Sequence, residues 1–299
     1  MPISEQQLEA WSHQGSIITS SSTYSSVRAA LAAVSSPLRT VNHEIYLQGS
    51  YKNDTNIRGD SDVDVIVQLN STFARDVSAL PADQVVLQRN EYAIATYNLP
   101  ELRRDVLQSL RDYYGAACVQ EGDRSIKLRA SPGRLAVDVI PSMLLKKYQY
   151  FYSDQCQQYV EGVKIFSREQ NREIVNFPKK HYSNGVAKQS ASRTNGCYKS
   201  AVRMFKNART YLTGHHALGD GVAPSYFVEC LVYNAPDSAF GGSLQDTFVG
   251  VLNSFRGAAP DALWCQNEEQ KLFGATQEQW NVEDARAFLN SLSNMWSRW

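Results

Sequence analysis

Residues 62–69, with the sequence DVDVIVQL, restrict the possible folds more than any other part of the chain. Valine stands at every second position of its first half, and two residues is the side-chain period of a β-strand. In such a strand the valines pack on one face. Asp62 and Asp64 then project together from the other face, with their attachment points roughly 6 to 7 Å apart. The pattern predicts a sheet that is covered on one side and carries two carboxylates on the other.

The two carboxylates of this strand create an electrostatic problem. At this separation they repel each other, and one would be driven toward its protonated form. A divalent cation removes the conflict, and hard oxygen ligands suit Mg²⁺. Taken alone, two aspartates separated by one residue are a common motif that a solvated strand face explains equally well. A metal site therefore needs support from other parts of the sequence.

Two further features give that support. Gly49 and Ser50 precede the acidic pair by a spacer of eleven residues, and a glycine lets a backbone approach a phosphate to which a serine hydroxyl can donate. Asp138 lies in the apolar run RLAVDVIPSM, where an isolated ionised carboxylate is costly. Hydrogen bonds to a turn, or an arginine such as Arg134, could explain Asp138 instead. A third metal-facing carboxylate on an adjacent strand is the better explanation.

This combination of carboxylates and a phosphate-binding loop is typical of nucleotidyl transfer. Two Mg²⁺ ions, with Mn²⁺ as a substitute, can activate a ribose hydroxyl and stabilise the leaving pyrophosphate. We therefore expect a ribose hydroxyl to attack the α-phosphate of a nucleoside triphosphate at this site.

The rest of the chain predicts an α/β (α+β) fold in two parts. Short strands alternate with helices in the first half, and a helix with apolar residues at helical spacing ends at Gly115. In the second half, helical patterns cover 195–212, 224–233, 243–256 and 281–298. We expect a mixed-sheet core with N-terminal helices over 1–165 and a helical lobe over 166–299.

Composition narrows the class of protein. The 299 residues are 43% hydrophobic, with 30 basic and 30 acidic residues, so a dedicated nucleic-acid binder is disfavoured. The five cysteines are scattered and predict neither a disulfide framework nor a zinc site. No stretch approaches the roughly 20 apolar residues that span a bilayer. With no signal-peptide pattern at its N-terminus, the chain is expected to be cytoplasmic, without a membrane partner.

The order of these motifs resembles that of the polymerase-β-like nucleotidyltransferases. Within that superfamily, GSYKNDTNIRGDSDVDVIV is similar to the bacterial relatives of cyclic GMP–AMP synthase. These are the CD-NTases, which make cyclic oligonucleotides for antiphage (CBASS) signalling. FPKKHYSNGVAKQSASRTNGCYKSAVRMFKNAR and PSYFVECLVYNAP resemble the helical lobe of the group's E clade. The resemblance implies a polymerase-β-like nucleotidyltransferase core with a mixed sheet, followed by a helical C-terminal lobe.

The resemblance also implies roles for the site residues. Gly49 and Ser50 would hold the donor triphosphate. Asp62 and Asp64 would bind both metal ions, and Asp138 would bind the catalytic ion and help deprotonate the acceptor hydroxyl. The members of this triad are the expected catalytic and metal-binding residues.

Two further nucleotide contacts follow from the helical lobe. Lys199 is similar to a lysine that reaches the triphosphate. Asn184 is similar to an asparagine linked with uridine use, although Asn176 competes for that alignment. No acidic residue occurs between Ile174 and Gly219, so the cations of this basic stretch are expected to lack local partners and to support the field at Lys199.

The leading hypothesis is an Mg²⁺-dependent enzyme that joins nucleoside triphosphates, ATP and/or UTP, into a cyclic dinucleotide second messenger. That product would act on a separate effector protein, and a nucleic acid or protein could activate the enzyme. The alternatives are an RNA terminal transferase, a linear oligonucleotide synthase, a protein-nucleotidylating enzyme and a catalytically silent nucleotide sensor. The three carboxylates argue against the silent sensor, because a binder gains little from clustering them.

Overall fold

The computed structural model describes residues 2–15, 18–59 and 62–299, and their contacts group them into two compact units. The sheet unit comprises 18–48 and 62–179, and the helical unit comprises 2–15, 49–59 and 180–299. The segment 49–59 therefore belongs with the helices, although strands of the sheet unit precede and follow it. The division of the chain into domains 1–165 and 166–299 stays a prediction.

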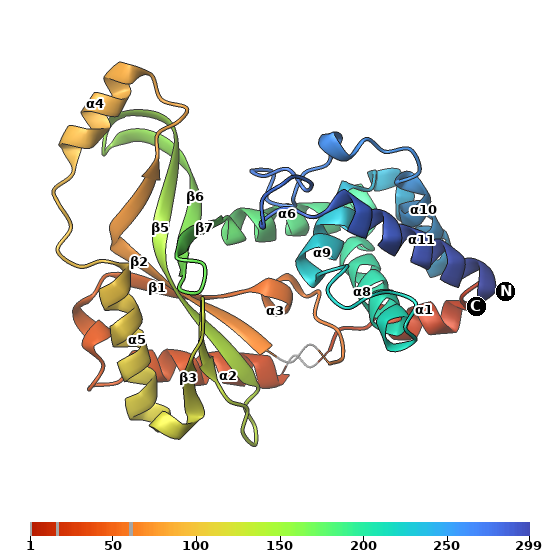
Figure 1. The fold of residues 1–299 in the computed structure, drawn as a ribbon, viewed down its shortest axis with the longest axis horizontal. Coiled ribbons are helices and arrows are strands. Elements are labelled where there is room, and N and C mark those ends of the chain that lie inside the picture. The colour runs from red at the N-terminus through yellow and green to blue at the C-terminus, as the bar shows by residue number, and fades with distance from the viewer. Residues whose placement is uncertain (1, 16–17, 60–61) are drawn as a thin grey trace. The chain divides into compact units, whose positions relative to one another are not determined.

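A mixed sheet forms the sheet unit (Figure 1). Five of its strands follow the order β1-β2-β5-β4-β3, while β6 pairs with β5 and β7 pairs with β6. Only β2 and β5 run parallel among the paired strands described, and α4, α5, β3 and β4 lie between them in the chain. The seven strands are β1 (His43–Gln48), β2 (Asp62–Asp76), β3 (Val119–Glu121), β4 (Ile126–Leu128), β5 (Ala136–Ser153), β6 (Cys156–Ser167) and β7 (Arg172–Asn176).

Helix α2 (Ile18–Leu31) contacts strand β2, and helix α5 (Leu99–Tyr114) contacts strand β5. The two helices also contact each other. In α5, buried Leu102, Val106 and Leu110 lie four residues apart and face the unit's interior. The helix begins at a capping box and ends before Gly115, whose φ is +86°. The spacing and the glycine stop predicted this helix, and the structure confirms both.

The strands β5 and β6 form a long hairpin, with α4 (Ala82–Glu91) beside β5 (Figure 1). Local sequence patterns predict neither α4 nor the full length of β5. In α4 the apolar residues Val85, Val86 and Leu87 are consecutive, so no apolar stripe marks a helix.

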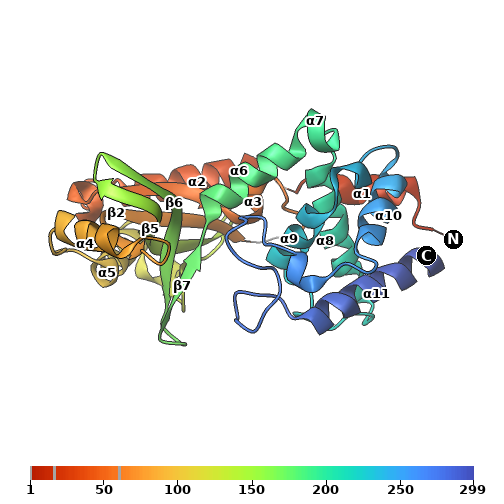
Figure 2. The same ribbon diagram turned by 90° about the horizontal axis from the view of Figure 1, so that it is seen from above.

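The helical unit is built around α8 (Tyr198–Gly214), which contacts α1 (Glu5–Ser12), α9 (Ser225–Asn234), α10 (Leu244–Ser254) and α11 (Val282–Arg298) (Figure 2). Its core includes fully buried Phe205, Phe248 and Phe288. The unit also contains α3 (Gly49–Asn53), α7 (Ala191–Thr194) and most of α6 (Pro178–Gln189).

Four helices predicted for the second half of the chain are confirmed as α8, α9, α10 and α11, each with ends within three residues of the expected ones. The cap of the last one is explicit, because the Asn281 side chain accepts from the backbone N–H groups of Glu283 and Asp284. The fold class, a mixed-sheet core followed by helices, is confirmed. Among the described residues, no helix combines the length and the apolarity needed to cross a membrane.

Candidate active site

The acidic strand folds as its alternation predicts. Val63 and Val65 are fully buried, Asp62 is exposed and Asp64 is half-buried. The parallel register between β2 and β5 sets Asp64 directly opposite Asp138, which is also half-buried. Neighbouring strands lie roughly 4.8 Å apart, so these two carboxylates stand side by side on one face of the sheet. Asp62, two residues before Asp64, shares that face.

A polar row extends from these carboxylates across five strands. Gln48 of β1 pairs with Asp64, and Lys127 of β4 pairs with Asp138. Gln120 of β3 then pairs with Lys127. The register therefore places the Lys127 cation beside Asp138. This neighbour could not be predicted, because the sequence of the turn between β4 and β5 does not specify how the two strands align.

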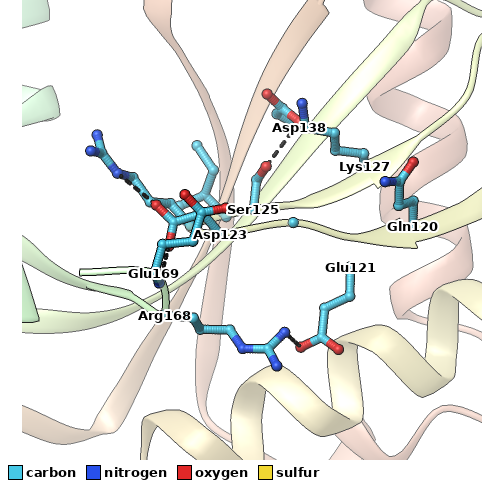
Figure 3. A pocket seen from close by; sticks show the side chains of 11 residues that line it. Gln120, Glu121, Asp123, Ser125, Lys127, Asp138, Arg168 and Glu169 are labelled. Carbon is cyan, nitrogen blue, oxygen red and sulfur yellow. Dashed lines mark hydrogen bonds and ion pairs between the residues drawn. The ribbon is translucent and has the colours of Figure 1, made fainter. Parts of the chain in front are cut away.

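Asp138 also accepts a hydrogen bond from Ser125 Oγ at 2.9 Å (Figure 3). Ser125 lies in the turn between β3 and β4. A hydrogen bond to a turn, one of the alternatives considered for Asp138, is therefore present. Arg134, the other partner considered, instead donates to the carbonyl of Arg129 and lies over the ring of Tyr114.

The donor chemistry of this face fits a hard divalent cation, because Asp62, Asp64 and Asp138 offer carboxylate oxygens from two adjacent strands. As they stand, no three His, Cys, Asp or Glu side chains within the described residues form a ready ligand cluster. Ion binding would require the three aspartate side chains to turn toward a common point.

Gly49 directly follows Gln48, the register partner of Asp64. Its φ of +69° lies in the left-handed region, which favours glycine. Gly49 and Ser50 begin the short helix α3 and belong to the helical unit. Within the spacer that separates them from Asp62, residues 60 and 61 lie outside the described part of the chain.

Lys199, in the first turn of α8, donates to Asp54 Oδ2 at 2.6 Å. It therefore contacts the same segment that carries Gly49 and Ser50. Asn184 of α6 donates through Nδ2 to the carbonyl of Gln266 at 2.7 Å, also in the helical unit. Its competitor Asn176 ends β7 in the sheet unit.

The expectation that the cations of residues 174–219 lack local partners is wrong for six of them. Their partners are carboxylates that lie far away in the chain. The ion pairs are Lys179 with Glu44 and Glu161, Lys180 with Glu269, Lys188 and Arg193 with Asp237, Lys199 with Asp54, and Lys206 with Glu229. Because an acid-free stretch of sequence can have acidic neighbours in space, local composition could not predict these pairs.

A pocket of about 870 Å³ opens beside Asp138 in the sheet unit (Figure 3). Its walls come from the β3–β4 turn, from Lys127 and Ile140, and from Arg168 and Glu169 after β6. It lies along one edge of β5, between Val139, which pairs with β4, and Met143, which pairs with β6.

Two contacts hold the walls of this pocket together. Asp123 accepts from the backbone N–H of Glu169 at 2.9 Å, and Arg168 pairs with Glu121 at 2.7 Å. Burial alone would raise the pKa of Glu121, but the guanidinium groups of Arg103 and Arg168 lower it below its usual value. The pocket is therefore polar and mixed in charge, which suits a polar ligand.

Residues 183–297 match the cGAS/DncV-like nucleotidyltransferase C-terminal helical domain, and residues 27–114 match a nucleotidyltransferase domain. The chain is 44% identical over 299 residues to the cyclic UMP-AMP synthase of Rhodothermus marinus. The matched region covers 100% of this chain and 99% of that protein. It is 36% identical to the cyclic nucleotide synthase CdnE01 of Staphylococcus haemolyticus, covering all of both chains. The solved structure of Rhodothermus marinus CdnE c-UMP-AMP synthase with Apcpp and Upnpp matches with a TM-score of 0.90, covering 100% of this chain and 98% of that one.

Proposed function

Because this chain belongs to the CdnE clade of the cGAS/DncV-like nucleotidyltransferases, we propose that it joins ATP and UTP into cyclic UMP–AMP through a linear intermediate. The family makes it a nucleotidyltransferase of the cyclic dinucleotide synthase type. The choice of bases is supported by its 44% identity to a cyclic UMP-AMP synthase, whose structure was solved with Apcpp and Upnpp.

One observation carries the proposed chemistry: the register that sets Asp64 opposite Asp138, with Asp62 on the same face. These three aspartates would hold Mg²⁺, with Mn²⁺ as a substitute. When bound, two such ions neutralise the charge that builds up on the attacking and leaving oxygens. In this proposal Asp138 also receives the proton of the attacking hydroxyl, and the buried valines of β2 keep the acidic face in place.

The donor triphosphate would be held by Gly49, Ser50 and Lys199. The left-handed Gly49 lets the backbone approach a phosphate without a side chain in the way. Lys199 reaches the same segment through Asp54. A triphosphate would compete with Asp54 for the ammonium group, which would then act as a charged donor to phosphate oxygens.

The acceptor nucleotide would lie in the pocket beside Asp138. Its volume of about 870 Å³ is in the range of small-molecule sites, roughly 300 to 1,000 Å³. Lys127 and Arg168 contribute positive charge to a lining that also contains the carboxylates of Glu121, Asp123 and Glu169. Asp138 is a lining residue, so an acceptor hydroxyl in this pocket would have a proton acceptor at hand.

Base choice would depend on Asn184 or on its competitor Asn176. Replacing each by serine in separate variants should decide between them. The residue that reads uracil should lose UTP use relative to ATP use on substitution, while the other variant keeps the wild-type ratio. If neither substitution changes the ratio, uracil is read elsewhere.

The proposed reaction places the protein in CBASS-type signalling. Its cyclic product would act on a separate effector protein, and a nucleic acid or a protein could activate synthesis. This arrangement needs nothing from the enzyme beyond release of a diffusible nucleotide.

The test uses the purified protein with each labelled nucleoside triphosphate and Mg²⁺ or Mn²⁺. The products are treated with phosphatase and separated. We expect a phosphatase-resistant product that contains label from both ATP and UTP and is absent with Asp62→Asn/Asp64→Asn. Label that appears only in an added RNA or protein would contradict cyclic dinucleotide synthesis, and a phosphatase-sensitive product would indicate a linear oligonucleotide synthase.

A further inference from the structure

The carboxylate of Glu229, in α9, is the meeting point of four side chains of the helical unit. Glu229 is 4% exposed. Its Oε1 accepts from Asn53 Nδ2 at 2.9 Å and lies 3.0 Å from His181 Nε2. Its Oε2 accepts from Thr55 Oγ1 at 2.8 Å and lies 3.7 Å from Lys206 Nζ. No feature of the sequence identified this residue, because its partners lie in three distant segments.

The carboxylate is held in its charged form. Burial alone would raise the pKa of Glu229, but the His181 ring, the Lys206 ammonium and the Thr55 hydroxyl hold it at about 2. Lys206 is only 1% exposed, so the two charges compensate each other within the unit. The other ring nitrogen of His181, Nδ1, is buried and has no hydrogen-bond partner among the described residues.

Asn53 and Thr55 flank Asp54, whose φ of +57° is uncommon for a residue with a side chain. Lys199 donates to the Asp54 carboxylate, and Arg203 donates to its carbonyl. The backbone N–H of Thr55 in turn donates to the carbonyl of Ser50 at 2.9 Å. The side chains of the helical unit therefore determine the path of the loop, and Thr55 connects that constraint to Ser50.

From this geometry we propose that Glu229 is a positioning residue for donor binding. Through Asn53 and Thr55 it fixes the backbone of Gly49 and Ser50 in the conformation that receives the triphosphate. The proposal rests on the proposed role of Gly49 and Ser50. A buried ion pair that served only the core could be replaced by apolar side chains without loss. The amide and the hydroxyl that donate to Glu229, by contrast, both come from this one loop.

The test substitutes Thr55, because Glu229 variants lose much stability. Thr55→Val keeps the shape and removes the donor to Glu229, and Thr55→Ser restores it. The matched control is Thr247→Val: Thr247 is equally buried at 1% exposure, and its hydroxyl bonds to Gly241 elsewhere in the helical unit. We expect Thr55→Val to raise KM for the donor nucleotide about tenfold, as loss of one well-placed contact would. Thr55→Ser and Thr247→Val should keep the wild-type KM.

A second readout is independent of activity. Amide hydrogen exchange of residues 50–56 should accelerate about tenfold or more in Thr55→Val and stay unchanged in Thr247→Val. If the wild type makes no cyclic product, the proposed function fails, while exchange still reports on the positioning. Unchanged exchange in Thr55→Val overturns the positioning role. Faster exchange with an unchanged donor KM shows that the loop is held for stability alone and overturns it as well.

Discussion

The ion pair between Glu229 and Lys206 gives a quantitative prediction for the stability of the helical unit. At 3.7 Å and an effective dielectric constant of about 20, two unit charges attract each other by about 4 kcal/mol. Glu229→Gln or Lys206→Met alone leaves the other buried group without its partner, which lowers the free energy of unfolding by about 3 to 5 kcal/mol. The pKa of Glu229 falls from 4.5 to about 2, which corresponds to about 3 kcal/mol. The double variant should therefore lose less than the sum of the single losses, by about 0.5 to 3 kcal/mol, the range found for residues in contact.

The assay is urea denaturation followed by tryptophan fluorescence. All five tryptophans lie in the helical unit, so the signal reports on that unit. Because folding lowers the pKa of Glu229, its stabilisation is complete above pH 4.5 and is lost as the pH falls toward 2. The stability difference between the wild type and Glu229→Gln should shrink over the same range. Strictly additive single losses, or a difference that does not change with pH, would refute this account of the pair.

Three further substitutions test the site and its support. Asp138→Asn should reduce cyclic product more than about a hundredfold, with the thermal midpoint unchanged; product formation near the wild-type rate would exclude Asp138 from catalysis. Gly49→Ala should cost about 1 to 2 kcal/mol of strain at its φ of +69° and raise the donor KM. Gly115→Ala, which also changes a glycine of positive φ (+86°) but at the end of α5, should leave KM unchanged. Val65→Ala should lower the free energy of unfolding by about 2 kcal/mol. The control is Val86→Ala: Val86 is 56% exposed, so its loss should change that free energy by less than about 0.5 kcal/mol. Equal effects would show that the valine face of β2 is not a packed core.

Local patterns were sufficient to predict much of the fold. The alternating valines placed Asp62 and Asp64 on one face of a strand, because a strand's two faces follow directly from its period of two residues. Apolar spacing predicted α5 and the four helices of the second half, because side chains three or four residues apart lie on the same face of a helix. Such signals depend on residues a few positions apart, so a single sequence contains them in full.

Contacts between distant segments were beyond these patterns. The register of β2 against β5, which sets Asp64 opposite Asp138, depends on how two strands far apart in the chain align. The acid-free stretch looked unpaired because its carboxylates come from other elements, such as Asp54 for Lys199. The role of Glu229 could not be predicted from its neighbours in the sequence either. A buried charge is tolerated only where tertiary packing brings a cation and hydrogen-bond donors around it.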